Sequence, residues 1–201
     1  MKIIFATTNL GKLKEIKAIL QDLDIEVISA QAAGITEKIK EDGKTLAENA
    51  LKKAKYVAKK AKEWALADDT GIFIKALAGK PGIMSARWAG KKASDKKIIN
   101  FTLKKLKNIP ADQRQAYFQT VAALAAPDGR SWTFEGKING QITLEPKGML
   151  RSNLPYDAIF IPQGLNKTFA EIPVEQKNLL SHRAQAFAKL KKFLINEGTR
   201  L

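Results

Sequence analysis

Residues 3–12 read Ile3-Ile4-Phe5-Ala6-Thr7-Thr8-Asn9-Leu10-Gly11-Lys12, an apolar run followed by a polar loop that contains a glycine and a lysine. The apolar run predicts a buried strand, and apolar residues at helical spacing after the loop predict a helix. A strand, a loop and a helix in this order favour an α/β fold. The loop suits phosphate, because free backbone N–H groups at a helix start and the helix dipole both favour an anion. It lacks the spacing of a P-loop, so an ordinary strand-to-helix connection is the alternative interpretation.

A second strand-like run, residues 64–71, delivers two adjacent carboxylates, Asp68 and Asp69, into a Thr-Gly turn. Carboxylates at a strand end are a common means of holding Mg²⁺. Neighbouring side chains of an extended strand point to opposite faces, so only one of the two could bind the metal directly unless the chain turns between them. Glu41, in another loop, could supply a second ligand oxygen. The alternative is that the two aspartates are turn residues before a glycine.

A helix is predicted over residues 45–63. It begins with a capping box, in which Thr45 is the N-cap and Glu48 follows three residues later. Asn49 and Lys53 lie four residues apart, so they share one face of this helix.

The centre of the chain carries a strong hairpin signal, Pro127-Asp128-Gly129-Arg130, between apolar runs at residues 117–126 and 131–135. Residues 72–74 are predicted to form a short strand of their own, and Gly140 is predicted to separate two more. The β-α start and the central hairpin together predict a mixed sheet in place of a regular doubly wound parallel one.

The composition restricts the class of protein. The chain has 201 residues, of which 45% are hydrophobic, and these numbers fit one α/β domain or two lobes around one core. The absence of cysteine excludes disulfides, thiol catalysis and thiolate metal sites, and it fits a reducing compartment. The N-terminal apolar run is too short for a signal peptide, and no run is long enough to span a membrane, so we expect a soluble, cytoplasmic protein.

The net charge of +15 raises the hypothesis of nucleic-acid binding. The basic residues are mostly lysines spread over helix faces, without the interleaved arginines and aromatics of a base-stacking surface. The pattern therefore favours a small anionic substrate over nucleic acid.

The single histidine, His182, adjoins Arg183 and follows Lys177 by five residues. This cationic group near a helix start suits nucleotide oxygens or a base carbonyl. A structural hydrogen bond is the alternative interpretation for a lone histidine.

Five segments of the chain, in this order and spacing, resemble the inosine-triphosphate pyrophosphatase family, whose members act on non-standard purine nucleoside triphosphates. The segments are ATTNLGK at residues 6–12, EDGKTLAENA at 41–50, ADDTG at 67–71, PGIMSAR at 81–87 and SHR at 181–183. Each motif is modest, and their ordered occurrence over essentially the whole chain is specific.

The resemblance implies an α/β, two-lobed fold with a long central mixed β-sheet flanked by helices and a substrate cleft between the lobes. It implies that residues 1–201 form a single nucleoside-triphosphate pyrophosphatase domain, which assembles as a homodimer. The implied reaction is Mg²⁺-dependent hydrolysis of ITP, dITP or XTP to the nucleoside monophosphate and diphosphate.

The resemblance also implies roles for individual residues. Glu41 and Asp69 would hold Mg²⁺, Asp69 would also activate water, Asp68 would support it, and Lys53 would act on the phosphates. The other implied substrate-binding residues are Thr7, Thr8, Asn9, Leu10, Gly11 and Lys12 for the triphosphate, Thr70, and Leu154, Pro155, Tyr156, Asp157, Lys177, His182 and Arg183 around the base.

The chain departs from the family in the loop before Asp157. The family run ends Gly-Phe-Gly-Tyr-Asp, whereas this chain has Leu154 in place of the stacking phenylalanine and Pro155 in place of the second glycine. A stacked ring contributes roughly 1–3 kcal/mol per base, which leucine only partly replaces. We therefore predict hydrolysis with altered or weakened base selectivity. A drifted, non-catalytic nucleotide-binding homologue and a basic nucleic-acid-binding module are the competing hypotheses.

Overall fold

The computed structural model describes residues 1–7 and 9–197, and the chain divides into two compact units. Unit 1 comprises Met1–Asp69, Thr120–Gly136 and the chain from Arg183 onward, and unit 2 comprises Thr70–Gln119 and Lys137–His182. Each unit has its own apolar core.

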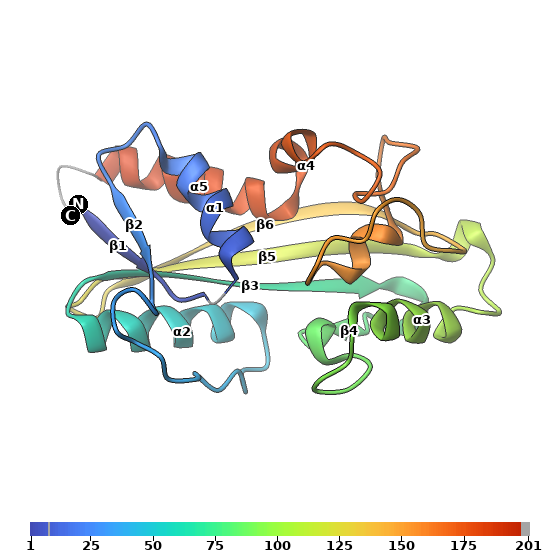
Figure 1. Cartoon of the computed structure of the whole chain (residues 1–201), viewed down its shortest axis with the longest axis horizontal. Coiled ribbons are helices and arrows are strands. Elements are labelled where there is room, and N and C mark those ends of the chain that lie inside the picture. Colours follow the sequence, from blue (N-terminus) through green and yellow to red (C-terminus); the bar gives the residue numbers. More distant parts are fainter. Residues whose placement is uncertain (8, 198–201) are drawn as a thin grey trace. The chain divides into compact units, whose positions relative to one another are not determined.

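The described strands form one mixed sheet in the order β2-β1-β3-β5-β6-β7, with β4 paired to β3 (Figure 1). β1 is parallel to β2 and β3, whereas β4 is antiparallel to β3 and β7 is antiparallel to β6. The mixed sheet predicted from the sequence is confirmed. The strands are β1 (Lys2–Phe5), β2 (Glu26–Ser29), β3 (Trp64–Ile74), β4 (Pro81–Gly82), β5 (Gln115–Ala125), β6 (Ser131–Ile142) and β7 (Phe160–Pro162).

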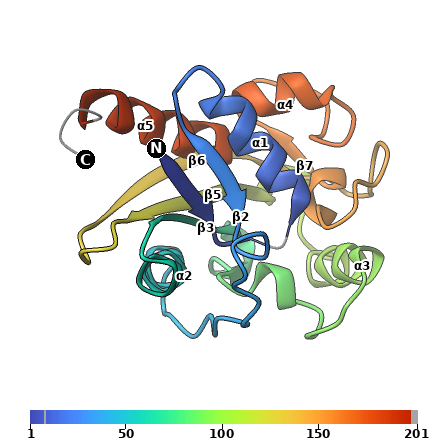
Figure 2. The ribbon, with the colours of Figure 1, turned by 60° about the vertical axis from the view of Figure 1, so that its left-hand side comes forward.

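The helices of the described residues are α1 (Leu10–Leu20), α2 (Leu46–Ala61), α3 (Asp95–Lys105), α4 (Val174–Leu180) and α5 (His182–Glu197). α2 confirms the predicted capping box, because the Thr45 hydroxyl accepts a hydrogen bond from the Glu48 N–H at 3.1 Å. In unit 1, α1 and α5 cover one face of the sheet and α2 covers the other (Figure 2). In unit 2, the core is built around the rings of Phe118, Phe160 and Phe169.

Two turn predictions are wrong. β3 runs without interruption from Trp64 to Ile74, so Asp68 and Asp69 lie inside a strand. Gly140 likewise lies inside β6. A Cβ at Gly140 would lie 2.6 Å from the Phe160 ring and would overlap the Ile161 carbonyl, so this glycine permits the close approach of β7.

No helix of residues 1–7 and 9–197 combines the length and the apolar character that crossing a membrane requires.

Candidate functional site

The predicted metal-site residues of unit 1 meet around one lysine. The Lys53 Nζ lies 2.6 Å from Glu41 Oε1 and 3.7 Å from Asp69 Oδ1, and it donates to the Asp68 carbonyl at 2.8 Å. Asn49, one helical turn before Lys53, donates its amide N–H to Asp69 Oδ2 at 3.1 Å. The predicted shared face of α2 therefore meets β3 at Asp69.

The electrostatics of this cluster are those of crowded carboxylates. Burial raises the pKa of Asp69; the ammonium of Lys53 opposes this shift and the carboxylate of Glu41 reinforces it. Burial alone would lower the pKa of Lys53, but the carboxylates of Asp69, Asp68 and Glu41 together raise it. Lys53 stays protonated, and Asp69 is more basic than an ordinary aspartate.

Asp68 points to the other face of β3, where it is buried among basic side chains. Lys12 Nζ contacts both carboxylate oxygens, at 3.0 and 2.8 Å, and Arg183 Nε lies 3.4 Å from Oδ2. The Arg183 guanidinium also donates to Glu15 Oε2 at 3.1 Å. Burial would raise the pKa of Asp68, but Lys12 and Arg183 hold it well below its usual range. The alternation predicted for the two aspartates is confirmed, and Asp68 is the member that binds two cationic side chains.

The loop before α1 differs from the prediction of free N–H groups at the helix start. Asn9 Oδ1 accepts hydrogen bonds from the N–H groups of Gly11 and Lys12, at 2.9 and 3.3 Å, so Asn9 is the N-cap of α1. The Thr7 hydroxyl in turn accepts from the Asn9 N–H at 3.1 Å. The two N–H groups are therefore occupied by Asn9 in this structure. Thr8 and the side chain of Leu10 lie outside the described part of the chain.

The donor set around Lys53 fits Mg²⁺. Glu41 and Asp69 converge on one ammonium, and Mg²⁺ is commonly bound by one or two carboxylates with its other positions filled by water and substrate phosphates. Among residues 1–7 and 9–197, no group of three or more histidine, cysteine, aspartate or glutamate side chains could hold a metal ion. The protein-derived ligands of such a site would be these two carboxylates.

The predicted base-site residues of unit 2 form a buried ion pair and an aromatic stack. Lys177 Nζ lies 2.5 Å from Asp157 Oδ2, and the two side chains are 5% and 4% exposed. The same ammonium lies 5.4 Å from the centre of the Phe169 ring. The His182 imidazole stacks on Phe118 with ring centres 4.5 Å apart and planes within 6°. His182 thus belongs to the aromatic core of unit 2.

The divergent loop residues are mostly internal. Pro155 and Tyr156 are buried at the start of a short 3-10 helix, Pro155–Ala158. The Tyr156 hydroxyl donates to the Ser85 carbonyl at 3.0 Å, and burial raises the pKa of this tyrosine. Leu154 is half-buried, as is Thr70 in β3. The Tyr156 hydroxyl therefore links the 3-10 helix to the segment at residues 81–87 by a hydrogen bond.

Two positioning contacts were missed by the sequence analysis. The Arg151 guanidinium donates to the carbonyls of Phe169 and Ile172, at 3.1 and 2.7 Å. Glu15 binds Arg183 from α1. A lone arginine that binds backbone carbonyls leaves no motif in the sequence, and the charge of Glu15 is one among many on exposed helix faces.

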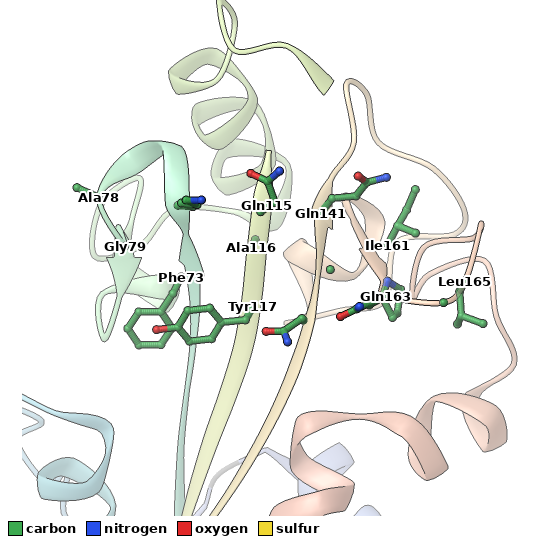
Figure 3. Close-up of a pocket in the computed structure, with 15 residues that line it drawn as sticks. Phe73, Ala78, Gly79, Gln115, Ala116, Tyr117, Gln141, Ile161, Gln163 and Leu165 are labelled. Carbon is green, nitrogen blue, oxygen red and sulfur yellow. The ribbon is translucent and has the colours of Figure 1, made fainter. Parts of the chain in front are cut away.

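Unit 2 also contains a cavity of about 800 Å³ that no predicted site residue lines (Figure 3). Phe73 and Tyr117 stack at its edge with ring centres 4.8 Å apart, and Gln115, Gln141 and Gln163 also line the cavity. The sequence motifs do not predict it, because its lining comes from four short segments that lie far apart in the chain.

Comparisons with known proteins agree with one another. The model of the Ham1 family matches residues 3–193. A relative from Bacillus subtilis strain 168, described as dITP/XTP pyrophosphatase, is 43% identical over 191 residues, which cover 95% of this chain and 96% of the relative. A relative from Geobacter sulfurreducens with the same description is 42% identical over 197 residues, 98% of both chains.

Solved structures give the same result. A HAM1 protein from Coxiella burnetii superposes with a TM-score of 0.90 at 36% identity, and the match covers 98% of this chain and 99% of that one. The Ham1 protein of Staphylococcus aureus superposes with a TM-score of 0.89 at 36% identity, with 98% and 100% covered.

Proposed function

Because the chain belongs to the Ham1 family, we propose that it hydrolyses non-standard purine nucleoside triphosphates, namely dITP, XTP and ITP, to the monophosphate and diphosphate. It is a hydrolase that acts on nucleoside triphosphates. The observation that carries the proposal is the convergence of Glu41, Asp69 and Lys53 in unit 1, because two carboxylates and a protonated lysine are the groups that phosphoanhydride hydrolysis needs.

Glu41 and Asp69 would hold Mg²⁺, which supplies charge neutralisation on the phosphates when it is bound. Asp69 would also accept the proton of the attacking water. Attack at the α-phosphorus then breaks the bond to the β-phosphate and releases diphosphate. Lys53 remains protonated beside these carboxylates and would stabilise charge that develops on the phosphate oxygens.

The start of α1 would bind the triphosphate through Lys12, Asn9, Thr7, Thr8 and the backbone of Leu10 and Gly11. Asn9 caps the helix and Lys12 is tied to Asp68, so both are pre-positioned. Asp68 itself is a positioning residue, because its carboxylate is shared between Lys12 and Arg183. Substrate phosphates would compete with Asp68 for the Lys12 ammonium.

The base would be read by Lys177, His182 and Arg183, with Thr70, Leu154, Pro155, Tyr156 and Asp157 around it. A cationic donor favours a 6-keto oxygen over the amino group of adenine. Leu154 replaces an aromatic stacking surface, so base selectivity is weaker than a phenylalanine would give.

Residues 1–201 would act as one domain, as a homodimer and in the cytoplasm. The single domain and the homodimer rest on the family resemblance, and the cytoplasmic location rests on the cysteine-free composition. The net charge of +15 fits a polyanionic substrate, and nucleic acid is the less favoured partner.

The test is a product assay on the purified protein with Mg²⁺. ITP, XTP and dITP are compared with ATP, GTP and dTTP, and diphosphate is scored separately from phosphate. Diphosphate release that favours the first three, lost in Asp69→Asn and kept in the exposed control Asp22→Asn, supports the proposal. No release from any triphosphate would favour a nucleotide-binding homologue without activity.

A further inference from the structure

The loop before the 3-10 helix Pro155–Ala158 carries an arginine, Arg151, whose side chain contacts several of the residues predicted to surround the base. The Arg151 guanidinium donates to Phe169 O at 3.1 Å and to Ile172 O at 2.7 Å, and its Nη1 lies 4.0 Å from Asp157 Oδ2. A planar guanidinium can bind several acceptors at fixed angles, which a lysine cannot do. Arg151 thus joins its own loop to the segment at residues 169–172 and to a carboxylate.

The segment that Arg151 holds leads directly into α4. Ile172 is followed by Pro173, the N-cap of α4, and no side chain of the described residues caps this seven-residue helix. Pro173 has no N–H, so it cannot anchor the helix start by donating a hydrogen bond. The Ile172 carbonyl bound by Arg151 is therefore an anchor just before α4.

Lys177 lies on α4 and forms the buried ion pair with Asp157. A short helix depends on tertiary contacts for its position. Arg151 acts on both members of this pair, since it fixes the start of the helix that carries Lys177 and lies beside the carboxylate that Lys177 binds. A shift of α4 would move the ammonium relative to Asp157.

We propose that Arg151 is a positioning residue for base selection: it holds the start of α4, and through it the Lys177 ammonium, in the place from which Lys177 contacts the base. This inference rests on the proposed function, in which Lys177 reads the base. Leu154 lacks the aromatic ring that would stack on the base. Arg151 would partly compensate by holding Lys177 in place for base selection.

The experiment compares Arg151→Met, Arg151→Lys and the exposed nearby control Lys167→Met. The measured quantities are kcat and KM for ITP and ATP, the melting temperature, and the NMR signal of the Lys177 side-chain ammonium, assigned by its loss in Lys177→Met. In Arg151→Met we expect KM for ITP to rise about tenfold and kcat to stay within about twofold. The ratio of kcat/KM for ITP to that for ATP should fall about tenfold. A factor of about ten corresponds to the loss of one hydrogen bond to a charged group. The Lys177 signal should shift or broaden, Arg151→Lys should lie between wild type and Arg151→Met, and the control should match wild type.

A lower melting temperature with an unchanged substrate ratio and an unchanged Lys177 signal would overturn the inference, because Arg151 would then only stabilise the fold. If Arg151→Met does not fold, Arg151→Lys answers the same question through its Lys177 signal and its substrate ratio. If the wild type hydrolyses no triphosphate, the proposed function fails while the NMR signal still decides whether Arg151 positions Lys177.

Discussion

Asp68 and Asp69 are consecutive residues of β3 that bind opposite sets of side chains. Asp68 faces Lys12 of α1 and Arg183 of α5, whereas Asp69 faces Asn49 and Lys53 of α2. The first carboxylate is surrounded by cations and has a lowered pKa, and the second is crowded by another carboxylate and has a raised pKa. We therefore expect Asp68 to be a structural and Asp69 a reactive carboxylate, and substitutions should separate these two roles.

Asp69→Asn should lower kcat strongly and change stability little. Removing a general base lowers kcat by about 10²–10⁴-fold. The stability should change little, because the lost attraction to Lys53 is offset by relief of the repulsion between Asp69 and Glu41. The measurement is kcat for diphosphate release together with a melting curve. A variant that loses activity only because it unfolds would contradict this assignment.

Asp68→Asn should instead lower the free energy of unfolding by about 3 kcal/mol, because Lys12 and Arg183 lose their shared buried counter-charge. Urea denaturation measures the change, and Asp22→Asn on the surface is the control. The pH dependence has a definite sign. The folded pKa of Asp68 is lowered, so its stabilisation is present above the unfolded pKa of about 3.9 and is lost as the pH falls further. Asp68→Asn should therefore unfold with less dependence on acid pH than the wild type.

Mg²⁺ should stabilise the protein through Glu41 and Asp69. A ligand that binds only the folded state, at a concentration of about 100 times its Kd, raises the free energy of unfolding by about 2.7 kcal/mol. This raises the melting temperature of a chain of this size by several degrees. The shift should vanish in Glu41→Gln and persist in Glu37→Gln, an exposed glutamate that pairs with Lys60. A shift of equal size in Glu41→Gln would place the metal elsewhere.

Leu154→Phe should restore an aromatic surface for the base. Stacking on a ring contributes about 1–3 kcal/mol per base, so kcat/KM for ITP should rise about tenfold, mainly through KM. Leu144→Phe, at an exposed position of the same unit, is the matched control. No change in Leu154→Phe would mean that the base does not lie against residue 154.

The parts of the molecule that the sequence predicted are those fixed by neighbours along the chain. The Thr45 cap and the shared face of Asn49 and Lys53 follow from helical spacing alone. The contacts of Asp68 with Lys12 and Arg183 join residues 56 and 115 positions apart, so no local pattern contains them.

The glycines of the long strands were misread for a related reason. Gly71 looks like a turn residue in the sequence, yet a Cβ there would lie 2.6 Å from the Gly82 carbonyl across the β3–β4 pair. Glycine is favoured both in tight turns and where a neighbouring strand approaches closely. Only the position of the partner strand shows which of the two applies.

The alternation within β3 also restricts how this segment can evolve. Deleting or inserting one residue between Trp64 and Asp68 would exchange the faces of every following side chain, and the two carboxylates would trade surroundings. The identity of residues 64–67 can therefore change more freely than their number, which should be under the same constraint as the two aspartates. A related chain with one residue more or fewer at this point should therefore lack the activity.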